Sequence, residues 1–209
     1  MKKLFITGIG TDIGKTVASA IVVEALQADY WKPIQSGDLD FSDTMKVQSM
    51  ISNSTTKFHP EAYTFQNPLS PHAAAALEHT RIDLNKIHVP STQNTLVIEG
   101  AGGLLVPLNE DQYIVDLIEQ TEAEVLLVSR NYLGSINHTL LTYEMLRSRN
   151  IKIKGLIFNG VETNSSESII QKHTNLPVLL HIHQEQTINK SIISSYAHSF
   201  LTNYNGCSE

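Results

Sequence analysis

Cysteine is almost absent from this sequence. One cysteine, Cys207, cannot form an internal disulfide or, by itself, a thiolate metal site, and such sparse use is typical of proteins in a reducing compartment. Long apolar runs are also lacking. The run that begins at Leu4 is interrupted by Gly8, Gly10 and Asp12, and no segment approaches the ~18 apolar residues of a membrane span. We therefore expect a cytoplasmic protein with no membrane partner.

Positive charge is scarce as well. Fifteen Lys and Arg stand against 21 Asp and Glu, and the net charge of −6 argues against a protein that mainly holds nucleic acid. The nine histidines do not predict a zinc site, because His181 and His183 share a strand face but no third ligand has a recognisable spacing. Any anionic ligand must be bound by a local arrangement of groups.

Length and hydrophobicity favour one compact domain over residues 1–209. Hydrophobic residues make up 41% of the 209 positions and charged residues 17%, which is enough to bury a core. Short β-branched and aliphatic runs alternate with longer helical stretches, as in a mostly parallel sheet with helices on both faces. Strands are predicted at 3–7, 30–32, 95–99, 124–129, 153–158 and 178–181, and helices at 14–28, 71–78, 113–120, 135–149, 166–173 and 190–202.

The region 36–70 has the least regular pattern. It contains Pro60, Pro68 and many polar residues, so we interpret it as a loop excursion and not as a second domain. Loops of this size usually serve a functional site.

The strongest motif is GIGTDIGKT at residues 8–16. It follows an apolar strand and precedes a helix, which is the context of a phosphate-binding loop. Glycines let backbone N–H groups face phosphate oxygens, Lys15 is expected at the β- and γ-phosphates, and the Thr16 hydroxyl is expected on Mg²⁺. The strict pattern places glycine where Ile9 stands, so a strand-to-helix turn with an accidental Gly-Lys-Thr is the alternative. The motif predicts an α/β P-loop NTPase-like domain, not a particular reaction.

Three further side chains are candidates for the same site. Lys32 ends the second predicted strand, where the carboxyl ends of parallel strands converge on a ligand crevice, so it can join Lys15 at a phosphoryl group. Glu99 ends the strand before EGAGG and resembles the Walker B carboxylate that faces Mg²⁺. Asp43 is a weaker metal candidate, because it is one of three neighbouring acids in a polar stretch. Each residue also has a structural explanation. Lys32 could be a solvated lysine at a strand end, Glu99 could open a simple turn, and Asp43 could belong to an exposed polar loop.

Three other segments have a structural explanation as well as a functional one. Residues 70–72 (SPH) suit a helix cap with Pro71 in the first turn. The amide of Asn159 suits either an adenine edge or a turn with Gly160. Residues 133–138 (LGSINH) open a predicted helix, where free N–H groups attract an anion, although ordinary capping by Ser135 explains the segment equally well.

Taken together, these blocks resemble the dethiobiotin synthetase family, in order and spacing from residue 3 to about residue 177. The resemblance includes the phosphate loop, because the family also has five residues between its glycines, so Ile9 fits the family pattern. The matching segments are the loop through Lys15 and Thr16, Lys32-Pro33 with Ser36-Gly37, Asp43, residues 70–72, 99–103 and 133–138, and Asn159.

The resemblance implies a reaction, a metal and a dimer. One amine of 7,8-diaminononanoate takes up CO₂ as a carbamate, ATP phosphorylates it, and the second amine closes the ureido ring. Mg²⁺ is the implied metal, ATP the co-substrate, and the chain a homodimer in which the helix start near Asn137 reaches the partner's substrate. The implied catalytic residues are Lys15, Lys32 and Thr11, and the metal residues are Thr16, Asp43 and Glu99. The implied nucleotide contacts are Asp12, Ile13, Gly14, Lys15, Thr16, Val17, Glu99, Gly100, Ala101, Gly102 and Asn159, and the substrate contacts are Ser36, Pro71, Gly134, Ser135 and Asn137.

Two departures from the family pattern concern specificity. Residues 180–183 (LHIH) replace a small residue, an acid and a proline near the adenine pocket, which leaves the base preference open. Tyr132 replaces a basic residue before the Leu133-Gly134 turn, so the substrate carboxylate is expected to have a different partner here.

Two rival functions belong to other classes. The alternative is a partitioning or scaffold ATPase that works as a protein-interaction switch, but such chains usually carry a second lysine early in the loop, and residues 8–11 contain none. A cobyrinate-type amide synthetase would need an appended glutaminase domain with a catalytic cysteine, for which this sequence lacks the length and the cysteine. A nucleotide-binding module without catalysis is a further alternative.

Overall fold

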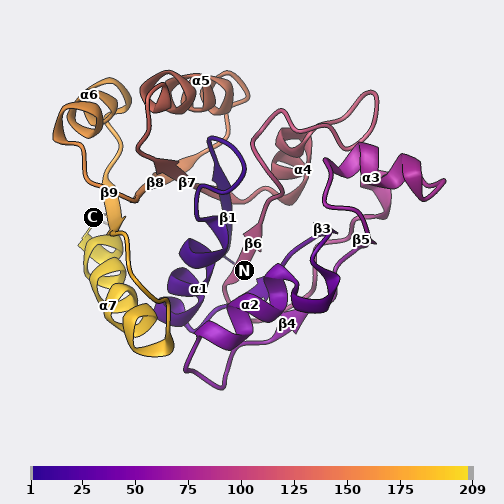
Figure 1. Ribbon diagram of the computed structural model, residues 1–209, viewed down its shortest axis with the longest axis horizontal. Helices are drawn as coiled ribbons and strands as arrows, with labels where there is room; N and C mark the ends of the chain where they lie inside the picture. Colours follow the sequence, from indigo (N-terminus) through magenta and orange to yellow (C-terminus); the bar gives the residue numbers. More distant parts are fainter. Residues whose placement is uncertain (1, 207–209) are drawn as a thin grey trace.

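The computed structural model describes residues 2–206, so Cys207 lies outside the described residues. Within this range the main sheet has seven strands in the order β4-β2-β6-β1-β7-β8-β9, and every neighbouring pair is parallel (Figure 1). These strands are β1 (Lys3–Gly8), β2 (Asp29–Trp31), β4 (Phe58–His59), β6 (Leu96–Glu99), β7 (Glu124–Arg130), β8 (Ile153–Asn159) and β9 (Val178–Ile182). A second parallel pair joins β3 (Ile34–Ser36) to β5 (Tyr63–Phe65). The predicted α/β class is confirmed.

Helices cover both faces of the main sheet (Figure 1). Three pack on one face, namely α1 (Lys15–Leu26), α2 (Asp43–Met50) and α7 (Lys190–Gly206). Three pack on the other, namely α4 (Ile114–Thr121), α5 (Ser135–Ser148) and α6 (Asn164–Thr174). The helix α3 (Pro71–Leu77) packs against the second pair, β3 and β5. Short 3₁₀ turns lie at Leu39–Phe41 and Leu84–Lys86. Among residues 2–206, every helix is too short or too polar to cross a lipid bilayer.

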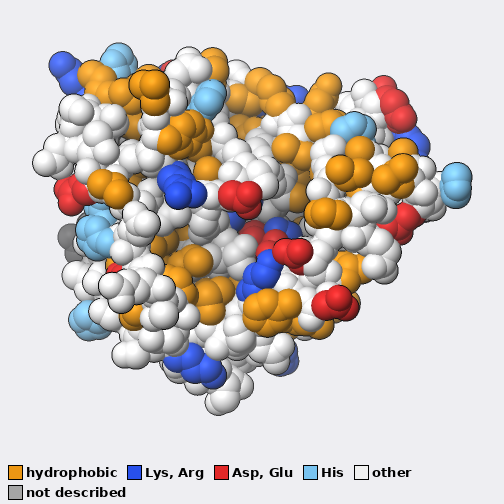
Figure 2. Space-filling view, viewed as in Figure 1, with side chains coloured by type: hydrophobic (Ala, Val, Ile, Leu, Met, Phe, Trp, Pro, Cys, Tyr) orange, Lys and Arg blue, Asp and Glu red, His pale blue; other side chains and the backbone are white. Residues whose placement is uncertain are grey.

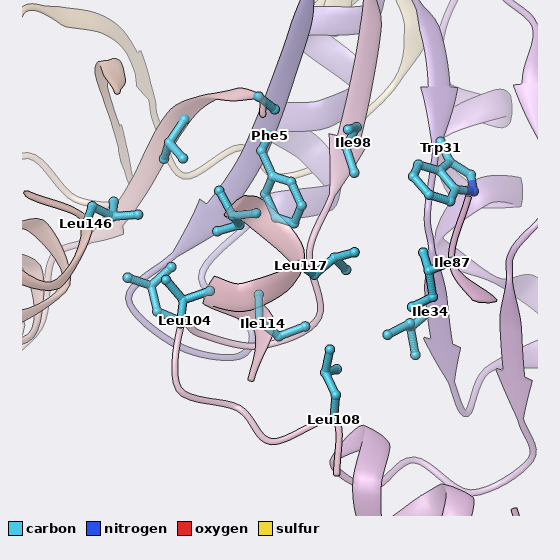
Figure 3. Close-up of a cluster of buried hydrophobic side chains, with 14 of the residues drawn as sticks. Phe5, Trp31, Ile34, Ile87, Ile98, Leu104, Leu108, Ile114, Leu117 and Leu146 are labelled. Carbon is cyan, nitrogen blue, oxygen red and sulfur yellow. The ribbon is translucent and has the colours of Figure 1, made fainter. Parts of the chain in front are cut away.

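The core has two layers because successive residues of a strand point to opposite faces. On β1, Leu4 and Ile6 pack among the residues of α1 and α7, while Phe5 packs on the other side. Figure 3 shows this second layer, where Phe5 and Ile98 of the sheet lie close to Ile114 and Leu117 of α4. Burial on both faces explains why the predicted strands are apolar through their length.

The expectation of a loop over residues 36–70 is wrong in part. That region contains α2, β4 and β5, and the preceding β3 was not predicted either. The start of α2 had a readable signal, since the Ser42 hydroxyl accepts a hydrogen bond from the N–H of Met45, 3.3 Å away. The rest of α2 offers little apolar periodicity, because Val47 is its one fully buried residue. A helix with so short an apolar stripe depends on tertiary contacts for its stability.

Candidate active site

A cavity of about 660 Å³ opens at the carboxyl ends of the strands β1, β2 and β6. This is the expected position for a ligand crevice in an open parallel sheet. Figure 2 shows acidic and basic side chains gathered in a hollow near the middle of the face in view. The charged residues that line the cavity are Asp12, Lys15, Lys32, Asp38, Asp43, Lys46 and Glu99.

The phosphate loop forms one wall of this cavity. It joins β1 to α1, and Thr11, Asp12, Gly14, Thr16 and Val17 face the cavity together with Lys15. The Lys15 ammonium donates to the carbonyl of Gly10, 2.7 Å away, so it folds back over its own loop. The predicted loop is thereby confirmed as a structural element at the start of α1.

Groups from the neighbouring strands hold the back of the loop. The Asn159 amide at the end of β8 donates to the carbonyl of Ile13, 2.8 Å away, and the Arg130 guanidinium at the end of β7 donates to the carbonyl of Asp12 at 3.0 Å. Gly14 has a φ of +95°, and a Cβ at this position would lie 2.2 Å from the Asn159 amide nitrogen. The loop therefore requires glycine here for two reasons, the left-handed backbone and the close approach of Asn159.

Lys32 lies between the two predicted metal carboxylates. Its ammonium is 2.7 Å from Oδ2 of Asp43, 3.1 Å from Oε1 of Glu99 and 3.1 Å from the carbonyl of Gly100. Thr16 donates from its hydroxyl to the same Oε1 of Glu99 at 2.9 Å. Residues from α1, α2 and β6 and the residue that directly follows β2 thus converge on one point.

The pKa values of the two lysines are shifted in opposite directions, that of Lys15 downward and that of Lys32 upward. Burial and the nearby Lys32 charge lower the pKa of Lys15 from 10.5 to about 8. Burial alone would also lower the pKa of Lys32, but the Glu99 and Asp43 carboxylates outweigh it and raise that pKa. Burial works against ionisation of Asp43, and the Lys32 charge more than offsets it, so the pKa of Asp43 is lowered. Lys32 is therefore held as a cation between two anions.

The donor set suits Mg²⁺. Hydroxyl and carboxylate oxygens are the ligands that this hard cation prefers, and P-loop sites usually hold it by a Thr or Ser hydroxyl and one or two carboxylates together with phosphates. Thr16 and Glu99 are already in contact, and Lys32 joins Glu99 to Asp43. In residues 2–206 no cluster of three or more His, Cys, Asp or Glu side chains is suited to a metal. All three predicted Mg²⁺ residues line the same cavity.

The opposite wall carries the residues expected at the substrate. Ser36 and Pro71 line the cavity, and within residues 2–206 the buried Ser36 hydroxyl has no hydrogen-bond partner. Ala101 and Gly102 lie beside the phosphate loop, since a Cβ on Gly102 would come within 3.6 Å of the Thr11 hydroxyl. Ser36, Pro71, Ala101 and Gly102 therefore all lie at the cavity that the phosphate loop lines.

Six of the predicted residues do not line this cavity. Ile13 is buried behind the loop, Gly100 contributes its carbonyl to Lys32, and Asn159 binds the loop from behind. Gly134, Ser135 and Asn137 are at the start of α5, which does not face the cavity of the same chain. Gly134 occupies the cap position there, so capping by the Ser135 side chain does not explain the segment.

The histidines at the end of β9 and directly after it have protein partners. The Nδ1 atom of His181 is 3.3 Å from the Glu167 carboxylate, and the ring of His183 stacks on that of His181 with centroids 6.5 Å apart. The backbone N–H of His183 donates to the Tyr196 hydroxyl at 3.0 Å. Residues 180–183 therefore join β9 to α6 and α7.

Sequence reasoning missed two residues that shape the site. Tyr30 donates its hydroxyl to Oε2 of Glu99 at 3.0 Å, and the Gln35 side chain accepts from the N–H of Asp43 at 3.2 Å. Tyr30 had a usable signal, because residues two apart on a strand share a face and Lys32 is two positions later. Burial and the Glu99 charge raise the pKa of the Tyr30 phenol well above 10.

Similar proteins agree on one family. A family model described as an AAA domain matches residues 2–191. The ATP-dependent dethiobiotin synthetase BioD of Cytophaga hutchinsonii is 51% identical, over 98% of this chain and 99% of that protein. The protein of the same name from Christiangramia forsetii is 50% identical, over 95% of this chain and 96% of the relative.

Solved structures share the fold at low identity. The septum site-determining protein MinD from Pyrococcus horikoshii has a TM-score of 0.62 at 12% identity, over 100% of this chain and 96% of that one. A ParA family ATPase from Chlorobium tepidum has a TM-score of 0.56 at 12% identity, over 99% of this chain and 98% of that one. This likeness shows a P-loop NTPase fold and no particular activity. The sequence identities and the geometry of the site agree, and the chain belongs to the family of ATP-dependent dethiobiotin synthetases, which are ligases.

Proposed function

We propose that this protein carboxylates 7,8-diaminononanoate with CO₂ and closes the ureido ring at the cost of ATP. The observation that carries the proposal is the convergence of Lys15 and Lys32 with the oxygen donors of Thr16, Asp43 and Glu99 on one cavity. Two ammonium groups and a set of oxygen donors suit phosphoryl transfer, in which negative charge develops on the transferred group. The dethiobiotin synthesis named for the relatives agrees with this substrate pair.

The reaction would proceed in three steps. One amine of the diamine attacks CO₂ and loses a proton, so a carbamate forms. A carbamate oxygen attacks the γ-phosphorus of ATP, which gives a carbamic-phosphoric mixed anhydride and releases ADP. The second amine attacks the carbonyl carbon and gives up a proton to the departing phosphate, the bond from that carbon to the phosphate oxygen breaks, and phosphate leaves as the ring closes.

The residues of the cavity would divide this work. Lys15 and Lys32 would stabilise charge on the phosphoryl group, and Thr11, which lines the same cavity, would donate its hydroxyl to the reacting carbamate. Mg²⁺, held by Thr16, Asp43 and Glu99, would neutralise phosphate charge. Lys32 contacts both carboxylates, and it would exchange these contacts for the phosphoryl group when nucleotide and metal are bound.

The nucleotide would lie along the phosphate loop. Its phosphates would meet the N–H groups between Asp12 and Val17 and the turn of Gly100 to Gly102, in accordance with the glycine-rich backbone there. Asn159 would contact adenine through its Oδ1 atom. Its Nδ2 atom already donates to the phosphate loop, which leaves Oδ1 as the atom for the base.

The substrate carboxylate would be bound by a second copy of the chain in a homodimer. Gly134, Ser135 and Asn137 do not line the cavity of their own chain, while Leu133 beside them is 104% exposed and Tyr132 43% exposed. An exposed apolar side chain next to a helix N-terminus suits an interface that also supplies anion-binding N–H groups. The cytoplasm is the proposed compartment, where ATP is available.

The test is ADP release with and without bicarbonate and the diamine, together with the mass of the product formed from ¹³C-bicarbonate. We expect ADP release to require both co-substrates and one labelled carbon in the product. Lys15→Ala should lose ~10²-fold or more of the rate, whereas Lys86→Ala, an exposed lysine outside the cavity, is the matched control. A rate of ADP release that is the same with and without the two co-substrates would reject the proposal and favour an ATPase of the partitioning type.

A further inference from the structure

Tyr30 is a buried polar residue beside the proposed metal site. It lies on β2, next to β6, and its side chain is 0% exposed. Its hydroxyl donates to Oε2 of Glu99 at 3.0 Å, and its ring packs against Phe58 with centroids 5.8 Å apart. The steps proposed above assign it no part.

The two oxygens of Glu99 have different partners. Oε1 accepts from the Thr16 hydroxyl at 2.9 Å and from the Lys32 ammonium at 3.1 Å, whereas Oε2 accepts from Tyr30. A carboxylate turns readily about its last bond, so a hydrogen bond that fixes one oxygen also directs the other. We infer that Tyr30 is a positioning residue that orients Glu99 so that Oε1 faces the metal ion, and this inference rests on the proposed function.

The three donors to Glu99 differ in what happens to them when metal and nucleotide bind. Lys32 is expected to turn to the phosphoryl group, and the Thr16 hydroxyl is expected to ligate Mg²⁺. Of these three, Tyr30 is the one that no step requires to move. It lies in the packed layer between the sheet and α1, so its position is set by the fold and not by the ligand.

A purely structural explanation is that a buried phenol needs an acceptor, and Glu99 provides one. The two explanations differ in their effect on the metal. Groups that hydrogen-bond a metal ligand from behind typically contribute 10- to 100-fold to metal affinity by keeping that ligand oriented. A phenol that merely finds an acceptor would affect stability, and metal affinity would stay unchanged.

The test is Tyr30→Phe, which removes the hydroxyl and keeps the ring. Mn²⁺ binding to the full chain in the presence of ADP is measured by electron paramagnetic resonance, and ADP binding without metal by calorimetry. We expect Mn²⁺ affinity to fall about tenfold or more, with metal-free ADP binding unchanged. Tyr143→Phe is the matched control, since that hydroxyl donates to the carbonyl of Thr174 at 3.0 Å on the opposite face of the sheet.

A second background separates positioning from stability. In Glu99→Ala there is no carboxylate to orient, so Tyr30→Phe should cause no further loss of Mn²⁺ affinity. If Tyr30→Phe does not fold, 3-fluorotyrosine placed at position 30 alone keeps the hydroxyl. Its ¹⁹F resonance should shift when Mg²⁺ is added to the ADP-saturated protein, because the metal draws charge from the carboxylate that the phenol contacts, whereas 3-fluorotyrosine at position 143 should show no shift. A position-30 resonance that Mg²⁺ leaves unchanged would overturn the inference.

The outcomes for this inference and for the proposed function can be told apart. Wild-type protein that binds no Mn²⁺ with ADP would reject the metal site and the proposed function with it. Wild-type binding that Tyr30→Phe leaves unchanged would overturn the role of Tyr30 alone. An equal loss in the Glu99→Ala background would likewise show that Tyr30 acts through stability and not through Glu99.

Discussion

Removal of the Lys15 charge should stabilise the ligand-free protein while it abolishes turnover. Lys15 is 8% exposed and its pKa is lowered from 10.5 to about 8, so the fold disfavours the charged form. A tenfold change in a proton-binding constant corresponds to about 1.4 kcal/mol, so the cost of keeping Lys15 charged at pH 7 is about 3 kcal/mol. Lys15→Met removes this cost, but it also loses the bond to the Gly10 carbonyl, worth about 1 kcal/mol.

The expected net gain at pH 7 is about 2 kcal/mol in the free energy of unfolding. For a chain of this size that corresponds to a Tm about 4–8 °C higher. The gain should depend on pH with a definite sign. Between pH 8 and 10.5 the unfolded chain binds more protons at Lys15 than the fold does, so the wild-type free energy of unfolding rises with pH. The advantage of Lys15→Met is therefore complete below pH 8 and lost as the pH rises toward 10.5.

The assay is urea unfolding of nucleotide-free wild type and Lys15→Met at several pH values, with Lys86→Met as the exposed control. Titrations elsewhere in the chain cancel in the difference between the proteins. Saturating ADP should reverse the order, since phosphates favour the charged lysine of the wild type. A Lys15→Met protein that is no more stable than the wild type at pH 7, or whose advantage does not shrink above pH 8, would refute the argument.

Three further predictions concern the site and the interface. Glu99→Gln and Asp43→Asn should each raise the Mg²⁺ concentration needed for half-maximal ADP release, and together they should lose less than the sum of the single effects, whereas strict additivity would place them in separate sites. Asn137→Leu should raise the KM for the diamine far more than that for ATP in steady-state assays, and an equal rise in both, or a fully active monomer in sedimentation, would contradict the shared site. Gly14→Ala should lower thermal stability by about 1–3 kcal/mol, because the new Cβ meets the Asn159 amide at a φ of +95°, and an unchanged Tm would count against that contact.

Much of the fold was readable from local patterns. The strands 3–7, 95–99 and 153–158 were predicted to within two residues of the observed ends, because strands buried on both faces leave continuous apolar runs. The region 36–70 was not, since β4 is two residues long, and α2 has one fully buried residue. Elements this short leave almost no periodicity, and their pairing with distant strands determines whether they form.

The sequence by itself determined the phosphate loop. Its glycines, Lys15 and Thr16 all lie within residues 8–16, and the backbone conformation of a short glycine-rich turn depends mainly on its own residues. The sequence also predicted Lys32, Asp43 and Glu99 as site residues, because Lys32 and Glu99 end predicted strands and Asp43 lies in a polar stretch. It contained no information on how these three side chains are arranged relative to one another.

Only the tertiary structure decided those arrangements. Asn159 holds the loop at Ile13 across 146 positions, Lys32 joins two carboxylates from different elements, and Tyr30 reaches Glu99 across 69 positions. The order of the parallel strands brings these residues together, because their carboxyl ends meet at one edge of the sheet whatever their distance along the chain. Contacts of this kind depend on strand order and register, which no short stretch of sequence encodes.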